Sequence, residues 1–146
     1  MKTSTKHTVL FLLLAGSILL LLSGCKYIKS QQMHELEQLA DTVQIQSGIV
    51  VDRQQRDREK VLGKPVYANI RIIYKPVDNY TKQDVYREII TVLEQNNWEG
   101  KVCEGCTTDY YTAGLQQGNY PIPIRAKVRV SKEDNTVSLY FEHPKP

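Results

Sequence analysis

The sequence predicts a two-layer α+β domain, in which a small, mostly antiparallel sheet of three to four strands carries one main helix on one face. Two patterns support this prediction. Apolar and polar residues alternate over residues 66–75, 122–130 and 136–142, as in strands with one buried face. Apolar residues recur at steps of three and four over residues 82–96, which predicts a helix between the first two strands. We also expect a tether helix on the N-terminal side of this domain.

The first 25 residues carry an export pattern. Lys2 and Lys6 precede an apolar run over residues 9–22, which ends in Leu22-Ser23-Gly24-Cys25. This segment resembles a bacterial lipoprotein signal peptide, whose lipobox reads Leu, a small residue, Gly or Ala, and Cys. The resemblance implies cleavage before Cys25 and a covalent lipid on its sulfur, and we expect no other cofactor. The run is shorter than the roughly 20 apolar residues that span a membrane, but an uncleaved anchor helix and a buried core helix remain alternatives.

The resemblance also divides the chain and places it in the cell. Residues 1–24 form the signal peptide, residues 25–64 the lipidated N-terminus with a tether helix and a charged linker, and residues 65–146 the α+β domain. Lys26 stands where an Asp commonly retains lipoproteins at the inner membrane. We therefore expect the outer membrane, facing the periplasm, if the source has two membranes, and otherwise the outer face of the plasma membrane. The lipid is the expected contact with the membrane.

The charge balance argues against a nucleic-acid partner. The whole chain is +3, and residues 1–24 contain two lysines and no acidic residue, so the mature chain falls to +1. Nucleic-acid-binding domains usually carry a strong basic excess.

The segment between the lipobox and the domain reads as a helix followed by a linker. Apolar residues at helical spacing predict a tether helix over residues 30–46, although a short strand near 43–51 competes with its end. Residues 52–60 are charged throughout with both signs mixed, which favours a solvated helix or linker.

Within the domain, residues typical of helix caps and turns separate the helix and the strands. Thr81 and Asp84 predict a capping box at the start of the main helix. Asn96-Asn97 can take the left-handed conformation that closes it. Residues 98–121 predict a long, glycine-containing loop, which is uncommon in compact domains and often functional. Residues 132–135 predict the turn of a hairpin between the last two strands.

Cys103 and Cys106 lie in this loop and allow three interpretations. A thioredoxin-like dithiol needs a helix that starts at the first cysteine, and the residues after Cys106 are poor helix formers. A zinc site needs further ligands, and His34 and His143 lie far away in sequence. The third interpretation, which we prefer, is a structural disulfide formed in an exported protein. We assign no metal ligands and no catalytic residues.

A basic stripe follows the strand over residues 122–130. Arg125, Lys127 and Arg129 share its outer face, and Arg71 and Lys75 could lie on the same face of the sheet. The stripe could bind an anionic ligand. The alternative is a solvated sheet face whose charges pair across strands, for example with Glu142.

Tyrosines supply the second part of a candidate binding surface. The chain has nine Tyr and two Phe. Tyr110, Tyr111 and Tyr120 fall in the long loop, and Tyr is favoured at interfaces because its large ring has a polar tip. The alternative is that such residues are half-buried parts of the core and its rim.

These features predict a non-enzymatic, lipid-anchored envelope protein whose domain is a binding or adaptor module. The sequence lacks the Gly-x-Ser-x-Gly and His-Glu-x-x-His signatures of hydrolases and metalloproteases. We expect another envelope protein as the partner, bound at a sheet edge or at the 98–121 loop. A redox or metal-dependent role of Cys103 and Cys106, and anionic-ligand binding by the basic sheet face, are the alternatives. The sequence does not indicate an oligomeric state.

Overall fold

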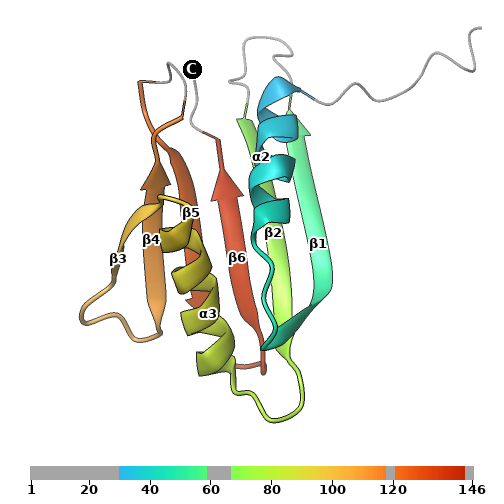
Figure 1. Ribbon diagram of the computed structural model, residues 1–146, viewed down its shortest axis with the longest axis vertical. Helices are drawn as coiled ribbons and strands as arrows, with labels where there is room; N and C mark the ends of the chain where they lie inside the picture. Colours follow the sequence, from blue (N-terminus) through green and yellow to red (C-terminus); the bar gives the residue numbers. More distant parts are fainter. Residues whose placement is uncertain (1–29, 59–66, 118–120, 144–146) are drawn as a thin grey trace, which may run out of the picture.

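The computed structural model describes residues 30–58, 67–117 and 121–143. These residues form a six-stranded antiparallel sheet of order β1-β2-β6-β5-β4-β3, with helices α2 and α3 packed on one face (Figure 1). The helices are α2 (Gln31–Thr42) and α3 (Lys82–Gln95). The strands are β1 (Gly48–Arg58), β2 (Tyr67–Pro76), β3 (Glu99–Val102), β4 (Tyr110–Leu115), β5 (Ile124–Val130) and β6 (Val137–Glu142). The signal peptide, Cys25 and Tyr120 lie outside the described residues.

The predicted sheet of three to four strands with one main helix is wrong. Strands β2, β5 and β6 and helix α3 lie where the sequence places them, but three further strands complete the sheet. Strand β1 occupies the segment expected to be a charged linker, and β3 and β4 occupy much of the expected loop. A second helix, α2, packs on β2 and β6 and so belongs to the same two-layer unit.

Strand β1 shows no alternation of apolar and polar residues because it is a bulged strand at the edge of the sheet with polar contacts. Its pairing with β2 shifts between Val50 and Asp52, which marks a bulge. On the helix side, the Arg53 guanidinium pairs with Asp41 at the rim of α2 at 2.9 Å. An edge strand with charges on both faces gives no apolar period of two, because neither face is fully buried.

The core lies between the sheet and the two helices. Helix α3 contributes Val85, Tyr86, Ile89 and Leu93, and α2 contributes Met33, Leu36 and Ala40. These side chains pack against one face of the sheet, whose buried residues are Ala68, Ile70, Ile72, Tyr74, Tyr111, Ala113, Ile124, Ala126, Val128, Val130, Val137, Leu139 and Phe141. Each fully buried aliphatic side chain contributes about 1.5–3 kcal/mol of transfer free energy. The helices therefore stay on the sheet because they cover its apolar face.

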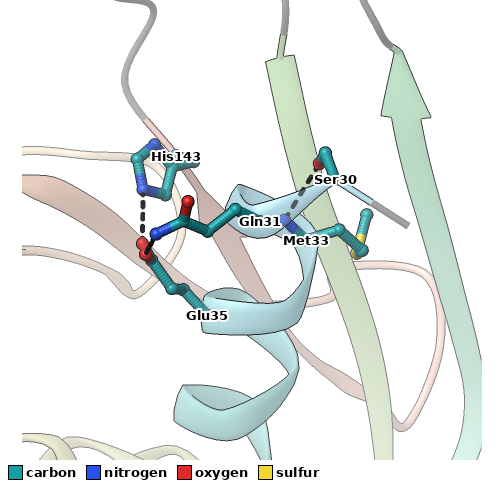
Figure 2. A network of polar contacts seen from close by, with 5 residues as sticks. All are labelled: Ser30, Gln31, Met33, Glu35 and His143. Atoms are coloured by element: carbon teal, nitrogen blue, oxygen red, sulfur yellow. Dashed lines mark hydrogen bonds and ion pairs between the residues drawn. The ribbon is translucent and has the colours of Figure 1, made fainter. Parts of the chain in front are cut away.

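Polar contacts fix the first turn of α2 to two strand ends. Ser30 is the N-cap, and its hydroxyl accepts a hydrogen bond from the Met33 N–H at 3.2 Å (Figure 2). The Ser30 N–H and hydroxyl donate to the Asp57 carboxylate at the end of β1, at 2.7 and 2.6 Å. The buried His143 ring donates from Nε2 to the Glu35 carboxylate at 3.0 Å (Figure 2). The helix start, β1 and the end of β6 thus meet at one end of the sheet.

The predicted capping box of α3 is present. The Thr81 hydroxyl accepts from the Asp84 N–H at 3.2 Å, and the Asp84 carboxylate accepts from the Thr81 N–H at 2.8 Å. The Thr81 hydroxyl also donates to the Asp84 carboxylate at 2.6 Å, and this bond, together with the one from the Thr81 N–H, lowers the pKa of the Asp84 carboxyl. At the other end, Asn97 adopts a positive φ of 63°. The Trp98 ring is buried, and its centre lies 5.3 Å from the centre of the Phe141 ring. Trp98 therefore closes the core after the helix ends.

A further carboxylate ties α3 to the start of β1. Glu88 accepts hydrogen bonds from the backbone N–H groups of Gln46 and Ser47, both at 2.9 Å, and from the Ser47 hydroxyl. Partial burial opposes ionisation of Glu88, but the hydrogen bonds outweigh it, so its pKa is lowered.

Edge strand β3 packs against the Tyr111 ring of β4 at Gly100. Tyr111 on β4 covers Gly100, and a Cβ atom at Gly100 would overlap the phenol oxygen of Tyr111 and come within 2.8 Å of the Ala113 Cβ. The absent side chain therefore makes room for the buried Tyr111 ring, in the way that aromatic residues cover edge glycines.

We predict that Gly100→Ala destabilises the protein by about 1–3 kcal/mol, because it overpacks the space that Tyr111 fills. Urea unfolding followed by tryptophan fluorescence measures this, since Trp98 is buried. The matched control is Gly114→Ala, whose Cβ would meet Pro123 at 3.3 Å. Equal midpoints for the two variants would mean that Tyr111 does not depend on Gly100.

Candidate functional site: the open face of the sheet

The face of the sheet opposite α2 and α3 is covered by no helix or strand of the described residues (Figure 1). We call it the open face. Side chains alternate across each strand, so the residues between the buried ones point to this face. Its members are Asp52, Gln54, Arg56, Tyr67, Arg71, Ile73, Lys75, Glu99, Lys101, Tyr110, Thr112, Arg125, Lys127, Arg129, Ser138, Tyr140 and Glu142. Basic side chains outnumber acidic ones on this surface.

The antiparallel register assembles the predicted basic stripe with Arg71. Tyr140 on β6 lies opposite Arg71 on one side and Lys127 on the other, and Thr112 lies beyond Lys127. The Lys127 ammonium lies 5.6 Å from the centre of the Tyr140 ring and 3.7 Å from the Glu142 carboxylate. These contacts hold Lys127 at the centre of the open face, although both partners are partly solvated and each contact is weak.

The four arginines on this surface have no acidic partner among the described residues, and three of them, Arg71, Arg125 and Arg129, lie on β2 and β5. Among residues 30–58, 67–117 and 121–143, no ion pair joins Arg71, Arg125 or Arg129 to a carboxylate. Glu142 lies opposite Arg125 in the register but pairs with Lys127. The interpretation of a surface neutralised by pairing across strands therefore accounts for Lys127 and not for the three guanidinium groups.

The open face is hollowed at two places that share Lys127. The larger hollow encloses about 770 Å³ and lies between β2, β4, β5, β6 and the β5–β6 turn. It is lined by Arg71, Ile73, Tyr110, Lys127, Arg129, Ser131, Lys132, Glu133, Asp134, Thr136, Ser138 and Tyr140. The smaller encloses about 570 Å³ and includes Lys101, Thr112 and Arg125. Both are shallow depressions on a broad surface, so they suit an extended ligand better than a small enclosed one.

The predicted tyrosine surface is divided by β4. Tyr110 lies on the open face, where its ring lines the larger hollow. Tyr111 lies on the opposite face and is only 1% exposed, so it belongs to the core and the prediction that it binds a partner is wrong. Burial raises the pKa of Tyr111 to about 12, with a smaller contribution from Glu94. Consecutive residues of a strand point to opposite faces, so both could not serve one surface.

Two residues of the surface were missed because residues 98–121 were interpreted as a loop. Lys101 on β3 and Thr112 on β4 are neighbours across the hairpin. A signal for β4 does exist in the sequence, since Tyr111, Ala113 and Leu115 alternate with Tyr110, Thr112 and Gly114.

Tyr140 remains a neutral hydrogen-bond donor at physiological pH. Burial among its neighbours raises the pKa of its phenol, and the Glu142 carboxylate and Tyr67 raise it further. A ligand at this position therefore meets a neutral hydroxyl between cationic groups.

Cys103 and Cys106 lie in the β3–β4 loop, away from the centre of the open face. Their sulfur atoms are at bonding distance and their Cα atoms are 5.7 Å apart. The Cys103 N–H donates to the Tyr110 carbonyl at 2.7 Å, and Gly105 supplies the positive φ of 82° that the turn requires. A strand, β4, follows this loop, whereas a thioredoxin-like dithiol opens a helix. The pair thus closes a hairpin loop whose neighbour Tyr110 belongs to the open face.

The two histidines lie apart from this surface. His34 is exposed on α2 near Gln38, while His143 is buried against Glu35 (Figure 2). Within the part of the chain that the structure describes, no cluster of three or more His, Cys, Asp or Glu side chains could hold a metal ion. The same residues include no helix that is both apolar enough and long enough to cross a membrane.

Comparison of the chain with protein-family models, curated proteins and solved structures finds no match. A function must therefore be argued from the site.

We predict that replacing both Cys103 and Cys106 by Ser leaves the domain folded. The loop-closure formula gives about 2 kcal/mol for so small a ring, and the helices and the central strands that form most of the core do not depend on the loop. Thermal unfolding of the variant, and of the unaltered protein with and without reductant, measures the loss. Complete unfolding of the variant would show that the β3–β4 hairpin is held by its disulfide.

Proposed function

We propose that this chain is a lipid-anchored, non-enzymatic protein of the cell envelope, whose domain binds another envelope component through the open face. One observation carries the binding role: the described chain leaves an entire face of the sheet uncovered, and the four arginines of this face have no acidic partner among the described residues. The lipobox resemblance of Leu22–Cys25 supports the anchor.

The proposed anchor would hold the domain close to the membrane. Four residues separate Cys25 from the N-cap Ser30. A fully extended chain spans at most about 3.6 Å per residue, so Ser30 would stay within roughly 18 Å of the lipidated sulfur. The partner must therefore be reached near the membrane surface, at the outer membrane in a bacterium with two membranes.

The edges of the sheet suit a partner less well than its open face. Strand β1 carries a bulge and a run of charges, and β3 has four residues. Bulges, charges and short length are the features by which natural sheets prevent strand addition. Strand addition by a partner, which the sequence suggested, is therefore the weaker route.

The anchor is tested with Cys25→Ala. We predict that this variant takes up no labelled fatty acid and leaves the membrane fraction, because it lacks the acceptor sulfur. The matched control replaces Cys103 and Cys106 by Ser, which removes the other two cysteines and should leave the protein on the membrane. Retention of Cys25→Ala in membranes washed with alkaline carbonate would instead support an uncleaved anchor helix.

The binding face is tested with a photoreactive amino acid in living cells. We predict discrete crosslinked products from Thr112 and Ser138 on the open face, and none from Thr91 and Gln38, which are exposed on α3 and α2. Immunoblotting of the membrane fraction detects them. Products from Thr91 or Gln38 alone would place the interface on the helical layer and refute the proposal.

A further inference from the structure

We infer that the partner presents an acidic polypeptide segment in an extended conformation, which lies along β5 on the open face with its carboxylates on Arg71, Arg125 and Arg129. This inference rests on the proposed binding function and names the chemistry of its partner.

The charges supply the first argument. The three guanidinium groups are exposed, lie on one face and have no acidic partner among the described residues. Arg binds carboxylates through two parallel N–H···O bonds, which gives geometric specificity in addition to attraction. Arg125, Lys127 and Arg129 carry like charges at successive positions on one face of β5 and repel one another, so a ligand with carboxylates lowers this repulsion.

The spacing supplies the second argument. Arg125, Lys127 and Arg129 are alternate residues of one strand, so their side chains repeat every ~6.8 Å. An extended polypeptide repeats its own side chains on one face at the same ~6.8 Å. Acidic residues at every second position can therefore face successive basic side chains. Arg71 lies two strands away, at about 10 Å, and reaches the segment from the other side of the larger hollow.

The composition of the hollow favours a polypeptide over other anions. Arg and Tyr are the residue types enriched at protein–protein hot spots, and the larger hollow combines Arg71 and Arg129 with Tyr110 and Tyr140. The phenol groups can donate to peptide carbonyls while their rings contact aliphatic side chains.

The position of the proposed anchor argues against the membrane surface as the ligand. Ser30 begins α2, which lies on the opposite face of the sheet, and it is bound to Asp57 at the end of β1. In the register, Arg129 lies level with Ser138, Ile73 and Asp52, whereas Ser30 is bound to Asp57, five residues farther along β1. Five residues of a strand span about 17 Å, so Arg129 and the larger hollow lie farther along the sheet from the proposed anchor than Ser30 does.

The test uses the full lipidated protein in a neutral detergent and polyglutamate as the probe, with binding measured by fluorescence anisotropy. We expect Arg71→Gln and Arg129→Gln each to weaken binding about tenfold, as the loss of one charge-assisted contact predicts. Arg87→Gln on α3 removes one positive charge from an exposed site off the open face and should change binding less than twofold. Circular dichroism confirms that the three variants are folded.

Three results would overturn the inference. An equal loss in Arg87→Gln would mean that polyglutamate senses net charge and not the open face. Tighter binding of polygalacturonate, a carboxylated glycan, would make the ligand a polysaccharide. Binding confined to phosphatidylglycerol vesicles would make it a lipid surface. These binding readouts do not depend on the anchor, so a failure of the Cys25→Ala test would refute the lipoprotein proposal and remove only the argument from the position of the anchor.

Discussion

The structure depends on the burial of one apolar face of a single sheet. Strands β2, β5 and β6 form its centre, and every second residue of each is buried under α2 or α3. Because strand side chains alternate, the same residues that build this core commit their neighbours to the other face. The polar open face is thus a direct consequence of the core, and no shift of register could remove it without exposing Ile70, Leu139 or Val128.

Polar contacts determine where the helices sit on this face. Apolar burial alone does not fix the position of a helix along a sheet, because it has no direction. The Ser30–Asp57 and Glu35–His143 contacts locate the start of α2 at one end, and Glu88 joins the middle of α3 to the segment before β1. The partly buried hydrogen bonds among these contacts contribute more to stability than exposed ones, because loss of one partner would leave the other polar group buried and unsatisfied. The start of α2 is thereby held next to the end of β6.

The helix and strands with a strong hydrophobic period could be predicted from the sequence, and those without such a period could not. Helix α3 could be predicted with its capping box, and β2, β5 and β6 from their alternation, because each faces a well-formed core on one side. Strand β1 could not, since its Arg53 and Asp57 contact the polar rim of α2. Strand β3 has only four residues, all exposed, so it shows no apolar period. Strand β4 does alternate, but it lies among the glycines of residues 100–118, which favour a loop. For the candidate site, Arg125, Lys127 and Arg129 followed from alternation alone, whereas Lys101 and Thr112 required the pairing of β3 with β4.

The unpaired charges of the open face are better explained by the proposed binding role than by a need for solubility alone. A sheet face that only needs to be soluble can mix charges and pair them across strands at little cost. Here Glu142 is drawn to Lys127, and the neighbouring guanidinium groups of Arg125 and Arg129 are left without acidic partners among the described residues. The turn residues Glu133 and Asp134 line the rim of the larger hollow and limit how far its basic character extends. Positive charge is thus concentrated along β5 and bounded at its end, and this would favour one position of the proposed acidic segment over general attraction to anions.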